Sequence, residues 1–96
     1  METDDFEWDD DKASACPSRH GVSFEEATYV FDDPDSIDEP DDRFIYGEER
    51  WNLMGFGETE LLVVAYTMRG ERVRIISVRR PDPHERERYD RLRSKT

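Results

Sequence analysis

Two apolar runs constrain the fold of this chain more than any other feature: LLVVAY at residues 61–66 and VRIISV at residues 73–78. Runs of this length, rich in valine and isoleucine, are typical of β-strands. Residues 68–71, MRGE, separate them, and Gly70 can take the positive φ that a tight turn requires. The runs therefore predict an antiparallel hairpin. A turn at residues 57–59 and one strand within residues 43–56 extend it to three or four antiparallel strands.

The N-terminal part predicts a short strand and two helices. The strand is FEW, residues 6–8, and the first helix spans residues 12–16, where Pro17 ends it. Ser23 followed three residues later by Glu26 forms a capping box for the second helix. Asp33 and Pro34 stop that helix, and residues 33–42 read as a polar loop.

The C-terminal part, residues 81–93, predicts a last helix. Asp82 is the expected N-cap, Pro83 the first helical residue and Glu85 the reciprocal partner of the cap. Tyr89 and Leu92 are its clear apolar contacts. The fold class expected for residues 1–96 is therefore a single α+β domain, with two N-terminal helices, an antiparallel sheet of three to four strands and a C-terminal helix.

Charge is unevenly distributed along the chain. Residues 1–68 hold 20 acidic and 4 basic residues, whereas residues 69–96 hold 5 acidic and 10 basic ones, for a net charge of −11. The overall sign disfavours nucleic acid as a ligand, because phosphate binding depends on lysine and arginine. The basic third can still form a local anion site. Twelve arginines against two lysines, in an acidic chain, suggest a halophilic source.

Several classes of site and location find no support. Cys16 is the only cysteine, so no intrachain disulfide can form, and a reducing interior is expected. The absence of a long apolar run and of a signal peptide leads us to expect a soluble, cytoplasmic protein. No zinc or phosphate-loop motif occurs, and no cofactor is expected; a carboxylate-bound Mg²⁺ remains open, since acidic residues are abundant.

Two residues are candidates for chemistry on local grounds. His20 is a natural general acid or base, although a histidine at a helix end is more often a cap. Strand alternation puts Arg79 in one column with Val73 and Ile75, where its guanidinium needs an anion. That anion can be a phosphate or, as the residues alone favour, a carboxylate of this chain. GEER, residues 47–50, is otherwise explained as a solvated strand face.

A set of motifs resembles, in order and spacing, the BrnT family of type II toxin–antitoxin toxins, over about residues 6–90. The motifs are FEWD (6–9), Lys12, RHGVSFEEA (19–27), VFDDP (30–34), GEER (47–50), LLVVAYT-x-RG (61–70), RIISVRR (74–80) and ER-x-RY (85–89). The resemblance implies a RelE-like fold and a metal-independent ribonuclease that arrests translation. It also implies a BrnA-like antitoxin of the ribbon-helix-helix class, with two toxins and two antitoxins in one complex. That complex would bind operator DNA only through the antitoxin.

The resemblance also implies roles for individual residues. RNA cleavage without a metal uses the 2′-hydroxyl as nucleophile and requires a base, an acid and cations. His20 and Glu49 are carried over as acid–base candidates and Arg50 and Arg79 as phosphate ligands, with Tyr89 a lesser catalytic candidate. The residues expected to bind RNA are Lys12, Arg74 and Arg80. The rival interpretations are an inactive homologue that acts as a co-repressor subunit and an acidic module that binds another basic protein.

This chain departs from the family pattern before His20. The family has an asparagine, two residues and then Lys-His, whereas residues 16–20 read Cys-Pro-Ser-Arg-His. Pro17 alters the end of the first helix and could move His20. The net charge of −11 should slow RNA capture in dilute buffer, a penalty that molar salt would largely remove.

Overall fold

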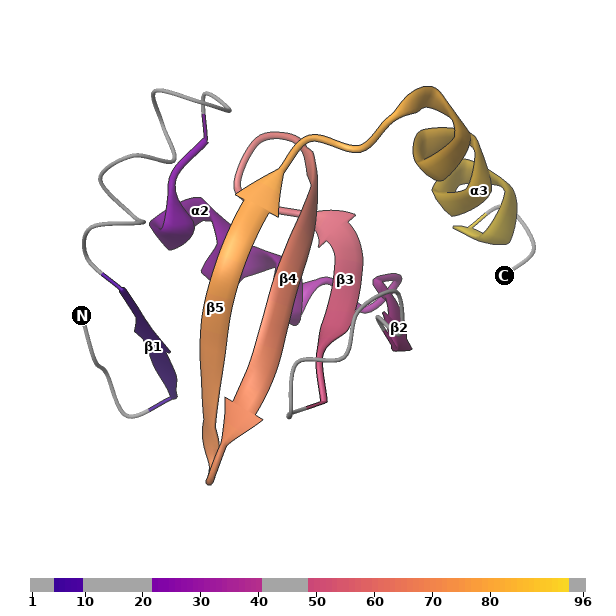
Figure 1. Ribbon diagram of the computed structural model, residues 1–96. Coiled ribbons are helices and arrows are strands. Elements are labelled where there is room, and N and C mark those ends of the chain that lie inside the picture. The colour runs from indigo at the N-terminus through magenta and orange to yellow at the C-terminus, as the bar shows by residue number, and fades with distance from the viewer. Residues whose placement is uncertain (1–4, 10–21, 41–48, 94–96) are drawn as a thin grey trace.

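The computed structural model describes residues 5–9, 22–40 and 49–93. Their strands form one five-stranded sheet in the order β1-β5-β4-β3-β2 (Figure 1). The strands are β1 (Phe6–Trp8), β2 (Ile37–Pro40), β3 (Trp51–Phe56), β4 (Leu61–Arg69) and β5 (Arg72–Arg79). The helical segments are α2 (Phe24–Thr28), the 3-10 turn η1 (Tyr29–Asp32) and α3 (Pro83–Arg93).

The central hairpin of β4 and β5 confirms the prediction from the two apolar runs. The strands pair antiparallel from Arg69 and Arg72 to Val63 and Arg79. Gly70 sits in the turn between them with φ of 63°, the left-handed value that glycine adopts without steric cost. β3 pairs antiparallel with the other side of β4, as expected for a meander.

The expected fold class is wrong in two respects. The sheet is mixed and has five strands, because β1 pairs parallel with β5 at one edge and β2 pairs with β3 at the other. β2 lies in the segment predicted as a polar loop. In addition, the strand predicted at residues 6–8 is confirmed and joins the sheet as β1, and the α-helices among the described residues are α2 and α3, so a layout of two N-terminal helices before the sheet does not hold. The helix expected at residues 12–16 lies outside the described residues.

A β-bulge in β5 changes which face of the sheet its last residues occupy. Ala65 pairs with Ser77 and Tyr66 pairs with Ile75, so Ile76 is the extra residue. A bulge adds one residue to one strand and shifts the alternation of side chains beyond it. Ile75 and Val78 are therefore buried on the same face, and Arg79 lies on the opposite one. The predicted column of Val73, Ile75 and Arg79 is wrong for this reason.

One face of the sheet holds the larger core, beneath α2 and η1. In Figure 1 α2 passes behind β5 and β4. The capping box of Ser23 and Glu26 starts the helix as predicted, with backbone-to-side-chain hydrogen bonds of 3.2 and 3.4 Å. Buried apolar side chains from both layers pack here. They are Trp8, Val22, Phe24, Ala27, Val30, Leu53, Leu62, Val64, Tyr66, Ile75 and Val78.

The other face has a smaller apolar cluster, to which α3 contributes one side chain. Tyr89 packs there with Met54, Leu61 and Val63, and Ile37 of β2 lies beside them. α3 follows a connection from the upper end of β5 and lies at the upper right in Figure 1. Among the described residues, neither helix has the length and apolar character needed to cross a membrane.

Candidate functional site

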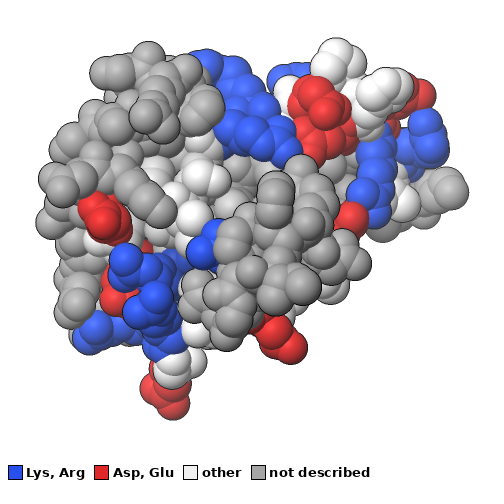
Figure 2. Space-filling view, in the orientation of Figure 1, with Lys and Arg blue, Asp and Glu red and all other residues white. Residues whose placement is uncertain are grey.

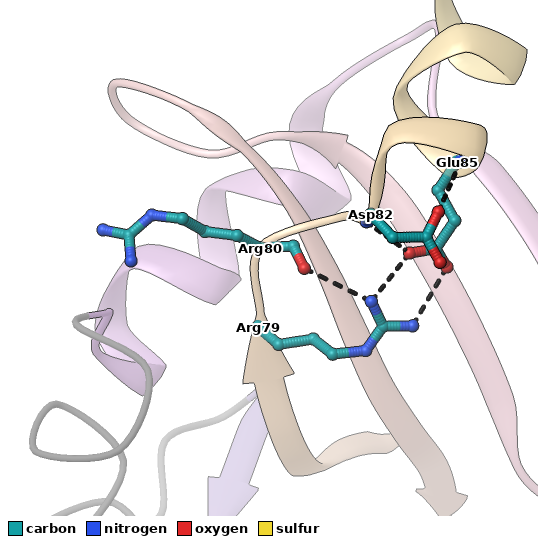
Figure 3. A network of polar contacts seen from close by, with 4 residues as sticks. All are labelled: Arg79, Arg80, Asp82 and Glu85. Atoms are coloured by element: carbon teal, nitrogen blue, oxygen red, sulfur yellow. Dashed lines mark hydrogen bonds and ion pairs between the residues drawn. The ribbon is translucent and has the colours of Figure 1, made fainter.

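The most organised polar cluster lies where β5 leads into α3 (Figure 3). The bulge directs Arg79 toward α3, and its two terminal nitrogens reach the two carboxylate oxygens of Glu85 at 2.7 and 2.9 Å. Nη1 of Arg79 also donates to the carbonyl oxygen of Arg80 at 3.2 Å. The guanidinium is thereby held in one orientation by a bidentate ion pair, the strongest form of this interaction.

Glu85 has a second role as the capping residue of α3. Its Oε1 accepts from the backbone N–H of Asp82 at 2.9 Å, and its own N–H donates to Oδ1 of Asp82 at 2.8 Å. This reciprocal pair confirms the capping box predicted from Asp82, Pro83 and Glu85. One carboxylate therefore receives hydrogen bonds from two nitrogens of Arg79 and from one backbone amide.

Arg80 extends away from Arg79 and from α3 (Figure 3). Its Nε lies 2.6 Å from Oε1 of Glu60, and its Nη2 lies 3.3 Å from Oε2. The hydrogen bond from Arg80 to Glu60, together with the carboxylate charge, raises the pKa of this arginine above its already high value. Two consecutive arginines therefore face opposite sides of the sheet, each beside a glutamate.

Three other predicted residues, Glu49, Arg50 and Arg74, lie toward the opposite end of the face that Arg79 occupies. Arg74 of β5 lies beside Glu7 of β1 and forms an ion pair with it, with 3.5 Å between Nη1 and Oε2. On its other side Arg74 is in register with Thr67 of β4. The hydroxyl of Thr67 donates to the carbonyl oxygen of Glu49, which places residues 49 and 50 beside this row. Glu49 is exposed and Arg50 is half-buried.

The two groups of arginines are anchored at opposite ends of this face of the sheet. Arg74 and Arg79 are five residues apart in a strand that rises about 3.3 Å per residue, so their Cα atoms are separated by roughly 15 Å. The row between them consists of Asn52, Ala65 and Ser77, which are in register. Figure 2 shows basic side chains in separate groups, near the upper end of β5 and near the lower end of the β4–β5 hairpin. The structure thus divides the predicted arginines into two groups.

Tyr89 occupies a structural position on the inner side of α3. It is 1% exposed, and its hydroxyl donates to Oδ2 of Asp33 at 2.6 Å. Burial raises the pKa of Tyr89, and the hydrogen bond and charge of Asp33 raise it further. The ring of Phe56 packs edge-to-face against Tyr89 at 5.7 Å. This hydroxyl anchors the helix to the loop after η1.

Asp33 is the residue that joins this loop, the sheet and α3. Besides Tyr89, its carboxylate accepts from the backbone N–H groups of Phe56 at 2.8 Å and Asp35 at 2.9 Å. Burial alone would raise the pKa of Asp33, but the hydrogen bonds and the charge of Arg93 outweigh burial and lower it. Gly55 permits this approach, because a Cβ there would lie 2.9 Å from Oδ2 of Asp33.

A shallow groove of about 100 Å³ runs between α3 and the edge formed by β2 and β3. Glu39, Asn52, Glu85 and Arg88 contribute its polar lining, and Arg88 forms an ion pair with Glu39 across it. His20 and Lys12, two of the predicted site residues, lie outside the described residues. Within the described ranges, no three His, Cys, Asp or Glu side chains are grouped so that they could hold a metal ion.

Comparison with known protein families identifies the family to which this chain belongs. Residues 8–85, most of the chain, match the family model described as the ribonuclease toxin, BrnT, of type II toxin–antitoxin systems. The chain belongs to the BrnT family. The match spans both arginine groups and ends at Glu85. No curated protein matches the chain.

Membership in the BrnT family makes the chain a relative of ribonuclease toxins that work with an antitoxin partner.

Two residues that organise the polar contacts of α3 were not predicted in the roles that the structure shows. Glu85 was expected only as a cap, although its distance of six residues from Arg79 across one turn could have suggested the pairing. Asp33 was expected only to stop a helix, and no local signal relates it to Tyr89, 56 residues away.

Proposed function

We propose that this BrnT-family protein is a metal-independent endoribonuclease toxin that cleaves RNA and inhibits translation. The observation that carries the proposal is the family match over residues 8–85. The placement of Arg79 supports it, because this guanidinium lies at the end of a face that also contains Arg74 and has a floor of Asn52, Ala65 and Ser77. Small side chains on a sheet allow a flexible strand of RNA to approach closely.

In the proposed mechanism, the 2′-hydroxyl attacks the neighbouring phosphorus and the 5′ oxygen leaves. Arg79 binds the scissile phosphate and stabilises the negative charge that develops on it. His20 and Glu49 share the roles of base and acid, and Arg50 acts as a second phosphate ligand. Arg74 and Lys12 bind the adjoining nucleotides, whereas Arg80, which faces the other side of the sheet beside Glu60, takes no part in these contacts. The separation of roughly 15 Å between Arg74 and Arg79 suits contacts to different phosphates of one strand.

Tyr89 has a supporting part in this proposal. Its hydroxyl already donates to Asp33, and its side chain is buried. Tyr89 therefore acts as a positioning residue, since it fixes α3 and so the position of Glu85 beside Arg79.

The partner of the toxin follows from the same family. We propose a BrnA-like antitoxin of the ribbon-helix-helix class, in a complex of two toxins and two antitoxins, which binds operator DNA through the antitoxin. The basic C-terminal third gives an acidic segment of the antitoxin an electrostatic target. Copurification with the product of the neighbouring gene tests this partnership.

A second function is favoured by one observation: Arg74, Arg79 and Arg80 each form an ion pair with a glutamate. A chain whose cations remain paired would bind the antitoxin and shape repression without cutting RNA. The two functions differ in a direct assay, because the co-repressor would leave RNA intact.

The decisive experiment incubates the purified protein with end-labelled RNA at low and at molar salt, with and without EDTA. Ribonuclease activity should survive EDTA and should be higher in molar salt, because a net charge of −11 repels RNA and salt screens that repulsion. Arg79→Ala should lower the rate by at least about tenfold, since it removes a bidentate phosphate ligand.

The matched control is Arg86→Ala, which removes the same charge from the exposed side of α3. It should retain the activity of the wild-type protein. Equal cleavage by wild type and Arg79→Ala would point to a contaminating nuclease and would sink the proposal. Intact RNA under every condition would favour the co-repressor.

A further inference from the structure

The carboxylate of Glu85 occupies the position that an anionic ligand of Arg79 would take. Nη1 and Nη2 of Arg79 point at its two oxygens, at 2.7 and 2.9 Å, and the N–H of Asp82 adds a third donor at 2.9 Å. Arginine presents the same fork to the two non-bridging oxygens of a phosphate. A carboxylate and a phosphodiester each carry one negative charge. Glu85 therefore fills an oxyanion site with a side chain of this protein.

The helix that carries Glu85 is suited to release it. Tyr89 is its one buried residue among residues 83–93. The helix otherwise contacts the rest of the fold through charged side chains, in ion pairs with Arg79, Glu39 and Asp35 and where Arg93 lies over the ring of Phe56. The side chains of Arg79 and Glu85 are 40% and 29% exposed, and ion pairs with this exposure to water are weak. If the carboxylate swings away, Oδ1 of Asp82 still caps the N–H of Glu85. Release therefore does not require α3 to unfold.

We propose that Glu85 is an autoinhibitory gate on an anion site at Arg79. In the resting protein the carboxylate of Glu85 holds the site, and an incoming phosphate binds by displacing it. The identity of that phosphate as part of RNA rests on the proposed ribonuclease function. The gate ensures that a phosphate binds Arg79 only when other contacts, such as those of neighbouring nucleotides, help it to displace Glu85.

The test removes the gate and keeps the cap. Glu85→Gln loses the charge, but glutamine still provides the oxygen that a capping box needs. Binding of a 2′-O-methyl oligoribonucleotide, which cannot be cleaved, is measured by fluorescence anisotropy. We expect Glu85→Gln to bind about fivefold more tightly than the control Glu87→Gln, the gain expected from removing a competing exposed ion pair. Glu87 lies on the same helix and pairs with Arg91, so this control removes an equal charge elsewhere.

Two further variants separate the gate from simple changes of charge or stability. Glu85→Asp keeps the net charge but shortens the side chain, so it should also bind more tightly than wild type. In the background of Arg79→Gln, replacing Glu85 should bring no gain. Thermal midpoints of all variants are measured first, and Glu85→Asp serves as the test if Glu85→Gln unfolds. Equal or weaker binding by the gate variants, or a gain that persists without Arg79, overturns the inference.

A titration with inorganic phosphate distinguishes failure of the gate from failure of the ribonuclease proposal. The Nε–H resonance of Arg79 is followed by NMR in wild type and in Glu85→Gln. The variant should respond at about fivefold lower phosphate concentration. If it does so while no variant binds or cleaves RNA, the gate stands and the ribonuclease proposal fails. If RNA is cleaved but the two proteins respond alike, the gate fails and the ribonuclease proposal stands.

Discussion

The two described helices hold to the sheet by different kinds of contact. α2, with η1, buries Phe24, Ala27 and Val30 to 1% exposure or less against the larger core. α3 buries Tyr89 and also contacts its neighbours through charged side chains. These contacts are the ion pairs Arg79–Glu85, Arg88–Glu39 and Arg93–Asp35 and the placement of Arg93 over the ring of Phe56. The first helix is attached by apolar packing, and the second largely by charge.

This difference separates the sheet with α2, which stabilises the fold, from α3, whose attachment can respond to salt, pH or a ligand. Apolar burial is non-directional and changes little with salt or pH. Exposed ion pairs are weak individually and are screened by salt, so a helix docked through them can move at small cost. The predicted phosphate ligand Arg79 lies at the junction of the two parts, on a strand of the rigid sheet but paired with the adjustable helix.

The largest expected effect comes from breaking the apolar side of this comparison. Phe24→Ala removes a ring that is 1% exposed and packs edge-to-face on Trp8 at 5.9 Å. Loss of a buried phenylalanine typically costs about 3–5 kcal/mol, a large part of the stability of a domain this size. Urea denaturation followed by tryptophan fluorescence measures the change.

The control on the other helix is Leu92→Ala, since Leu92 is 41% exposed on α3. Its effect should stay within about 0.5 kcal/mol. Similar losses for the two variants would mean that α3 is attached by apolar packing as firmly as α2, and the comparison would fail.

A smaller effect is expected from Tyr89→Phe, which removes the hydroxyl that donates to Asp33 and keeps the buried ring. A hydrogen bond to a charged group contributes about 1.5–3 kcal/mol, and a loss near the lower end is expected at neutral pH because Asp33 is only half-buried. Urea denaturation of both proteins provides the measurement, and hydrogen exchange in α3 should show that the loss is local.

The pH dependence of that loss identifies its cause. The folded-state pKa of Asp33 is lower than its ordinary value of 3.8, so its stabilising contribution is complete above that pH and disappears as the pH falls through the lowered value. The stability difference between wild type and Tyr89→Phe should therefore be constant from neutral pH to about 5 and should shrink below 3.8. A difference that does not change in acid would assign the effect to packing of the ring.

The same comparison explains how far the sequence could be interpreted. Local signals were sufficient for the hairpin of residues 61–78 and for both capping boxes, because apolar runs and short-range hydrogen bonds depend on neighbours in the chain. β2 was missed because an edge strand with the sequence IDEP has one apolar residue and ends in proline. The parallel pairing of β1 with β5 depends on contacts more than 60 residues apart, which no local pattern encodes.

The site was less predictable than the fold. The residue types were suggested by the family motifs, but the face of Arg79 depends on a bulge at Ile76, which is set by the register of β4 against β5. Alternation without that bulge assigns Arg79 to the wrong face. The pairing of each arginine with a glutamate could be expected in so acidic a chain. Which glutamate each arginine meets depends on tertiary structure, since Glu85 follows the turn between β5 and α3, whereas Glu60 lies in the connection between β3 and β4.

The smallest effect is expected from salt, and it sharpens the comparison most directly. Raising the salt from 0.1 M to 1 M shortens the screening length from about 10 Å to about 3 Å. The whole protein should gain stability, because salt screens the repulsion among the excess acidic side chains that give the net charge of −11. The ion pairs that dock α3 should weaken over the same range by no more than about 1 kcal/mol in total. Amide hydrogen exchange should therefore slow in α2 and slow less, or quicken, in α3. Parallel changes in the two helices would mean that charge does not attach α3, and would remove the physical basis for a gate at Glu85.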